Sequence, residues 1–109
     1  MNSSIKQAWI EALRSGTYNQ GSGCLRENDR YCCLGVLTDL YIKENKLEWV
    51  PGKHGDYFFN GTAGTLPRAV SEWAKLGSDN PLVDDRSLAG WNDSGTSFEE
   101  IADLIEEGL

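Results

Sequence analysis

Apolar side chains recur at helical spacing in four segments of the chain. Positions i, i+3, i+4 and i+7 share one face of a helix, so this spacing is typical of a helix with one buried side. Each short helix is marginally stable alone, and we therefore expect the four apolar faces to pack against one another. The predicted helices cover residues 4–15, 31–44, 66–76 and 98–107.

Capping patterns mark where the first and last of these helices begin. Ser4 with Gln7, and Ser97 with Glu100, have the spacing of a capping box, in which the serine accepts a backbone N–H and the longer side chain returns a hydrogen bond. Gly16 follows the first helix at the position where a left-handed residue commonly ends one. Both helices are therefore well delimited by the sequence.

The two middle helices differ in pattern. The first turns of the second helix, Tyr31–Leu37, are apolar nearly all round, so we expect this helix to be central and the most buried. The third helix has Thr65 as its predicted N-cap and Pro67 in its first turn, and it ends at Gly77. The side of the second helix opposite its apolar stripe carries four polar residues, Thr38, Asp39, Lys43 and Glu44.

Turn-forming residues between the helices predict small β elements. Residues 17–30 are rich in glycine and asparagine, which predicts a loop or a short hairpin that closes on Leu25. Residues 47–64 combine aromatic residues with glycines, as in an irregular loop or a short edge hairpin. Within residues 81–89, the pair Asp84-Asp85 separates two short apolar runs and predicts a two-stranded hairpin.

Length and composition are those of one domain. The chain has 109 residues, of which 39% are hydrophobic and 25% charged, enough for one packed core and too few for two. The fold class that we predict for a single globular domain over residues 1–109 is mainly α (α+β). It is a compact bundle of about four short helices with one or two small β-hairpins.

Acidic residues are concentrated in the last third of the chain. Ten Lys and Arg against 17 Asp and Glu give a net charge of −7, which disfavours nucleic-acid binding because that depends on cationic side chains facing phosphates. Residues 1–77 carry nine basic and eight acidic side chains, and residues 78–109 carry one basic and nine acidic, so the net charges are +1 and −8.

The last helix holds five of these acidic side chains. Such a stripe is most often a solvated helix face. The alternative is a partner-binding surface that mimics a polyanion or docks on a basic groove. The candidate partner-binding residues are Glu99, Glu100, Asp103, Glu106 and Glu107.

Neither a membrane segment nor an export signal is visible. No window approaches 18 consecutive apolar residues, and no basic segment followed by an apolar run opens the sequence. We therefore expect a soluble protein with no membrane partner. Its three cysteines are an odd number outside a secretory context, which favours reduced thiols and a cytoplasmic location.

Two metal-site patterns fail, and we predict no metal or other cofactor. A calcium loop with Gly95 at its sixth position would start at Gly90, where an acidic ligand is needed. Residues 92–97 are better explained as a turn before the capped last helix. Zinc is disfavoured because Cys32 and Cys33 are adjacent in a predicted helix, where their side chains point about 100° apart, and no C-x-x-C pair exists.

The same two cysteines are candidate nucleophiles. A helix N-terminus lowers a thiol pKa, which makes catalysis by Cys32 or Cys33 conceivable. The sole histidine, His54, lies in a glycine-rich loop and supplies no evident base. We favour small core residues over nucleophiles and predict no catalytic residue.

A glycine-rich segment suggests a site for an anion. Gly21-Ser22-Gly23 offers backbone N–H groups that, with nearby Arg14, Arg26 and Arg30, suit a phosphate. The spacing matches no phosphate-binding motif, and a plain turn is the commoner use of such glycines. For a small anionic ligand, such as a nucleotide signal, the candidate ligand-binding residues are Arg14, Tyr18, Gln20 and Arg26.

Several segments resemble a group of small bacteriophage proteins. Residues 9–21 contain ALRSG-x-Y-x-Q-G, and residues 31–37 read YCCLGVL, the most specific part of the resemblance. Leu66-Pro67, Trp73 and residues 92–102 are similar to the C-terminal half of that group, so most of the chain is covered. The resemblance implies a phage origin, and hence the host cytoplasm, but it brings no catalytic residue.

A phage origin favours two kinds of function, of which we prefer the first, and the cysteines leave a third class open. An accessory protein that inhibits a host protein, including a defence-system component, needs a rigid acidic surface, which the sequence provides. A binder or sequesterer of a small anionic ligand needs a polar pocket, which the sequence only suggests. A cysteine-dependent enzyme is the least favoured, because the sequence shows no general base for the cysteine.

Overall fold

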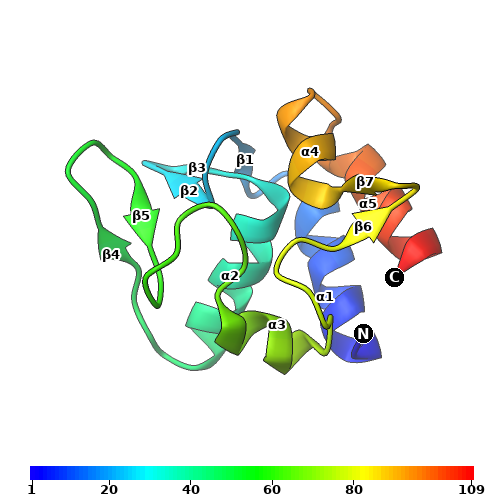
Figure 1. The fold of residues 1–109 in the computed structure, drawn as a ribbon, viewed down its shortest axis with the longest axis horizontal. Helices are drawn as coiled ribbons and strands as arrows, with labels where there is room; N and C mark the ends of the chain where they lie inside the picture. The colour runs from blue at the N-terminus through cyan, green and yellow to red at the C-terminus, as the bar shows by residue number, and fades with distance from the viewer.

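Five helices and seven two-residue strands make up the fold, which confirms the predicted mainly α (α+β) class. The computed structural model describes residues 1–109 (Figure 1). The helices are α1 (Ser3–Arg14), α2 (Cys33–Glu44), α3 (Arg68–Ala74), α4 (Leu88–Asp93) and α5 (Phe98–Gly108). The strands are β1 (Asn19–Gln20), β2 (Arg26–Glu27), β3 (Arg30–Tyr31), β4 (Val50–Pro51), β5 (Tyr57–Phe58), β6 (Leu82–Val83) and β7 (Arg86–Ser87). No helix is both long enough and apolar enough to cross a membrane.

One hydrophobic core holds the helices together. Helix α2 lies in the middle of the molecule, with α1 and α5 on one side of it and the β4–β5 hairpin on the other (Figure 1). The core contains 18 buried residues, which come mainly from these three helices. Trp9 of α1 is fully buried, and its indole Nε1 donates a hydrogen bond of 3.0 Å to the Cys33 carbonyl of α2.

Helix α2 is the most buried helix, as its apolar first turns predict. Thr38 and Asp39 lie on the side opposite the apolar stripe, and yet they are only 0% and 4% exposed. Thr38 Oγ1 donates to the Leu34 carbonyl at 2.9 Å. Asp39 accepts hydrogen bonds from Tyr18 and Trp49. Segments outside the helix therefore cover this side, which a helical pattern alone does not reveal.

The start of α2 packs directly on the backbone of the preceding loop. A Cβ at Gly35 would lie 1.7 Å from the Leu25 carbonyl oxygen, so only glycine permits this approach. The same carbonyl accepts a hydrogen bond of 3.1 Å from the Cys32 N–H. Leu25 is fully buried, which confirms that the loop closes on this residue.

The strands form three small sheets. β1, β3 and β2 form one sheet in that order, with β1 parallel and β2 antiparallel to β3. The pairs β4–β5 and β6–β7 are antiparallel hairpins. Asp84 and Asp85 form the β6–β7 turn, as predicted, with φ values of 50° and 61° that match the twist of a tight hairpin. For residues 17–30 and 47–64 the sequence predicts either a loop or a short hairpin, and the structure has a hairpin in both.

One of the two predicted capping boxes is present. Ser97 and Glu100 exchange the expected hydrogen bonds at the start of α5. The box predicted for Ser4 and Gln7 does not form, because α1 begins one residue earlier and Asn2 is its N-cap. The Asn2 side chain accepts a backbone N–H at 2.9 Å.

Helices α2 and α3 are both shorter than predicted. Tyr31 belongs to β3, because it pairs with both neighbouring strands of the sheet. Thr65 does not cap α3, whose N-cap position is occupied by Pro67 without a side-chain hydrogen bond. The helix ends before the predicted stop at Gly77, because Lys75 adopts the left-handed conformation with φ of 56°.

The sequence pattern does not predict helix α4. The second strand of the predicted hairpin ends at Ser87, whose side chain caps α4 by accepting the Gly90 N–H at 3.1 Å. Asn92 and Asp93, which we expected in a turn, form the last turn of this helix. Six residues that include a glycine are too short for their periodicity to identify a helix.

Candidate functional site

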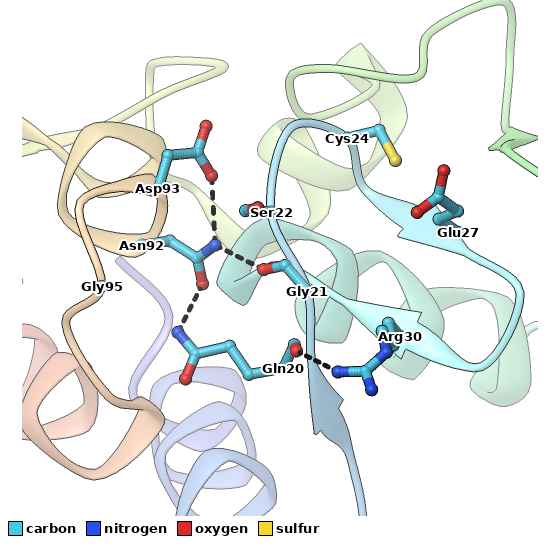
Figure 2. A pocket seen from close by; sticks show the side chains of 9 residues that line it. All are labelled: Gln20, Gly21, Ser22, Cys24, Glu27, Arg30, Asn92, Asp93 and Gly95. Carbon is cyan, nitrogen blue, oxygen red and sulfur yellow. Dashed lines mark hydrogen bonds between the residues drawn. The ribbon is translucent and has the colours of Figure 1, made fainter.

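A cavity of about 400 Å³ lies between the loop after β1 and the end of α4 (Figure 2). Cavities of this size are typical of small-molecule sites. We call it the polar cavity, because almost all the residues that line it are polar or glycine. They are Gln20, Gly21, Ser22, Cys24, Glu27, Arg30, Asn92, Asp93 and Gly95.

Asn92 anchors one wall of this cavity. Its side chain, only 2% exposed, donates to the Gly21 carbonyl at 2.8 Å. Its Oδ1 accepts from Gln20 Nε2 at 3.0 Å and from the Cys33 N–H at 3.2 Å. Gln20 Nε2 also donates to the Thr96 carbonyl at 2.8 Å. These bonds tie β1, the start of α2 and the end of α4 into one rigid unit.

Two carboxylates and one guanidinium give the polar cavity its charge. Asp93 Oδ1 accepts the Gly23 N–H at 3.1 Å. Arg30 Nη1 donates to the Gln20 carbonyl at 3.4 Å. The Glu27 side chain lies on the same wall as Arg30 (Figure 2). The lining is therefore not simply cationic, as an anion cradle would be.

The four candidate ligand-binding residues lie in three different places. Only Gln20 lines the polar cavity. Arg14 pairs with α5, and its guanidinium lies 2.6 Å from Asp103. Tyr18 and Arg26 both contact the Tyr31 ring. The structure therefore does not bring the four side chains together around one ligand.

Arg26 lies against a cluster of aromatic rings. Its guanidinium carbon is 3.9 Å from the Tyr57 ring centre, 5.3 Å from that of Tyr31 and 5.9 Å from that of Trp49. Tyr18 packs edge-on against Tyr31 with a centroid distance of 5.0 Å. Such cation–π contacts stabilise the guanidinium where it is, at the junction of the hairpins.

Asp39 is the buried centre of a polar cluster that the sequence did not suggest. It accepts hydrogen bonds from Tyr18 Oη at 2.5 Å and from Trp49 Nε1 at 3.0 Å, and Lys43 Nζ lies 3.0 Å away. Burial raises the pKa of Asp39, but these three partners outweigh it and the net pKa is below the usual value. Burial, followed by the bond to Asp39, raises the pKa of Tyr18.

The thiols at the start of α2 are structural. Cys32 and Cys33 are buried, and burial raises the pKa of both, that of Cys32 to about 11. Cys32 Sγ accepts the Gly35 N–H at 3.4 Å and thereby caps the helix. His54 lies in the β4–β5 loop and donates only its backbone N–H, to Asp56. This geometry contains no thiol–imidazole pair and disfavours a nucleophilic role.

The acidic side chains of the last third are all exposed. On α5, Arg14 pairs with Asp103 and, at 3.5 Å, with Glu106. Leu82 of β6, the strand that packs on α5, is 65% exposed. We call the exposed side of α5 together with the β6–β7 turn the acidic surface. Its carboxylates belong to Asp84, Asp85, Glu99, Glu100, Asp103, Glu106 and Glu107.

A comparison with known protein families finds a match that covers the whole chain. Residues 1–109 match the family described as Domain of unknown function (DUF8296). The chain belongs to this family. No curated protein and no solved structure matches it.

In this DUF8296 domain, three segments that are far apart in the sequence meet through Asn92. They are β1 with the loop after it, the start of α2 and the end of α4. Sequence reasoning named Gln20 and Arg30 but assigned Asn92 and Asp93 to a turn. No local signal identifies them, because their role depends on burial and on partners about 60 to 70 residues away.

Proposed function

We propose that this protein acts by non-covalent binding, as a phage-type accessory protein that docks on a basic surface of a host protein and inhibits it. A component of a host defence system is included in this class of partner. The observation that carries the proposal is the exposure of all seven carboxylates of the acidic surface, with Leu82 65% exposed on the adjoining strand.

The acidic surface suits protein docking for two physical reasons. Its carboxylates create a field that attracts a basic partner and orients the encounter. The exposed Leu82 offers an apolar contact within a polar surround, which is the composition of a small interface. Helix α5 is held in place by buried residues, so the surface is formed before a partner arrives; these residues are Phe98, Ile101, Ala102 and Ile105.

Two further findings support binding over catalysis. The only thiols at a helix N-terminus are buried, and burial raises the pKa of each. The resemblance of residues 9–21 and 31–37 to small phage proteins favours a partner that belongs to the host. Inhibition then requires only that the acidic surface occupy a basic site on that partner.

A pair of matched charge reversals tests this function. A partner is first captured from host lysate, and its affinity for the pure protein is measured by calorimetry. The variant Glu99→Lys/Glu107→Lys changes two acidic-surface residues that make no polar contact within the chain. The control Glu44→Lys/Glu48→Lys makes the same change of net charge at exposed residues of α2 and the loop after it.

We expect the acidic-surface variant to weaken binding about tenfold or more, because like charges then face each other. The control should change the affinity by less than about twofold, because rim or remote charges contribute little. Equal effects of the two variants, or no effect of either, would show that the partner binds elsewhere. Thermal unfolding of both variants confirms that the fold is intact.

A further inference from the structure

Three charged side chains line the polar cavity without pairing with one another. Glu27 of β2 and Arg30 of β3 lie on one wall, and Asp93 of α4 lies on the other (Figure 2). None of them belongs to an ion pair within the chain, whose salt bridges all involve other residues. Their charges are therefore available to a ligand.

Two hydrogen bonds fix the orientation of the Asp93 carboxylate. Its Oδ1 accepts hydrogen bonds from the Gly23 N–H at 3.1 Å and from Asn92 Nδ2 at 3.2 Å, which leaves Oδ2 free. Asn92 is itself held by the buried bonds that join β1, α2 and α4. A carboxylate held in this way loses little conformational entropy when a ligand binds.

The opposite wall also keeps unused hydrogen-bonding capacity. The only hydrogen bond of the Arg30 side chain is the one from Nη1 to the Gln20 carbonyl at 3.4 Å, so Nε and Nη2 remain free. Glu27 makes no side-chain hydrogen bond, and Ser22 adds a hydroxyl between the walls. The guanidinium can therefore bind a carboxylate through two parallel N–H groups.

We propose that the polar cavity binds a basic α-amino acid, of the class of lysine, ornithine and arginine. Such a ligand carries two cationic groups and one carboxylate, which complement the two carboxylates and one guanidinium of Glu27, Asp93 and Arg30. A cavity of about 400 Å³ accommodates a molecule of this size. The lining contains no aromatic ring, so a nucleobase would find no stacking partner. The site is independent of the acidic surface.

Cys24 provides a direct readout of occupancy. It lines the polar cavity and is half-buried, whereas Cys32 and Cys33 are buried in the core. Alkylation of the folded protein with N-ethylmaleimide therefore reports on Cys24. A ligand in the cavity shields this thiol and lowers the alkylation rate.

The experiment measures how three related compounds slow alkylation of Cys24. The probes are L-lysine, cadaverine, which lacks the carboxylate, and L-norleucine, which lacks the second ammonium group. L-lysine should protect Cys24 with a half-saturating concentration at least about tenfold lower than either analogue, because each analogue leaves a charged group of the site unpaired. No protection by L-lysine up to about 10 mM, or equal protection by an analogue, overturns the proposal.

Substitutions of lining residues test whether L-lysine protects Cys24 by binding in the polar cavity. Glu27→Gln and Arg30→Gln change exposed side chains, whose only hydrogen bond within the chain is the one of 3.4 Å from Arg30 to the Gln20 carbonyl. Each should raise the half-saturating L-lysine concentration about tenfold. The control Asp29→Asn, in the turn between β2 and β3 and outside the lining, should change it less than about twofold. Rates with and without ligand are compared within each variant, because burial, followed by the charge of Glu27, raises the pKa of Cys24. An equal effect of all three substitutions overturns the proposal.

Discussion

At the scale of single residues, Gly35 sets how closely α2 approaches the loop before it. A Cβ there would lie 1.7 Å from the Leu25 carbonyl oxygen and 2.7 Å from its carbonyl carbon. Both are backbone atoms, which cannot rotate away as a flexible side chain does. The close contact explains why a glycine stands in the most buried stretch of the helix.

Gly35→Ala is therefore expected to lower the free energy of unfolding by about 3 kcal/mol, the upper range for overpacking. Urea denaturation measures the change. Gly64→Ala is the matched control, because a Cβ at Gly64 meets nothing within 4 Å, and its effect should stay within about 0.5 kcal/mol. If Gly35→Ala were as mild as the control, the loop and α2 would not be in contact as described.

Asp39 makes stability depend on pH. Burial raises the pKa of Asp39, but the bonds from Tyr18, Trp49 and Lys43 outweigh it and lower the net value. A carboxyl with a lowered folded-state pKa contributes stability above its unfolded pKa of about 3.9, and this contribution is lost as the pH falls through the folded-state pKa.

The destabilisation caused by Asp39→Asn should consequently be constant near neutral pH and shrink as the pH falls below about 4. Urea unfolding of both proteins at a series of pH values gives this difference directly. Glu48→Gln, an exposed substitution in the loop after α2, serves as the control and should show no such trend. If the difference in free energy of unfolding between the wild-type protein and Asp39→Asn stayed the same at acid pH, the carboxylate would not be stabilised by its partners.

At the scale of elements, predictions from the sequence are accurate where burial follows the helical period. α1 and α5 were predicted within a residue of their ends, because their apolar stripes coincide with the side that packs on the core. The burial of Asp39 was not predicted, because its partners Tyr18 and Trp49 come from segments outside the helices. Gln20, Gly21, Ser22 and Arg30 of the polar cavity were already candidates from the sequence. Asn92 was not, because it acquires its role only from partners brought near by folding.

Two substitutions at the start of α1 distinguish the capping box predicted at Ser4 from the N-cap observed at Asn2. Asn2→Ala should lower the free energy of unfolding by about 1 kcal/mol, because Asn2 accepts the backbone N–H that caps the helix. Ser4→Ala should be neutral or slightly stabilising, since Ser4 lies inside the helix, where alanine is the better helix former. Chemical denaturation of the two variants tests this order, and the reverse order would favour the capping box at Ser4.

At the scale of the whole molecule, charge is unevenly distributed. The acidic surface lies at the end of the molecule formed by α5 and the β6–β7 hairpin, whereas the β4–β5 hairpin lies at the opposite end (Figure 1). Arg14 of α1 neutralises part of this surface through Asp103 and Glu106 but leaves Glu99 and Glu107 free of polar contacts. The electrostatic field at this end of the molecule therefore favours the approach of a basic molecule.

The dependence of the association rate on ionic strength tests the proposed docking most directly. The rate constant for the captured partner and the wild-type protein should fall about tenfold or more from low to high salt, because exposed charges are then screened. The Glu99→Lys/Glu107→Lys variant should associate slowly and with a much weaker dependence on salt. A wild-type rate that does not change with ionic strength, or the same dependence in both proteins, would contradict docking through the acidic surface.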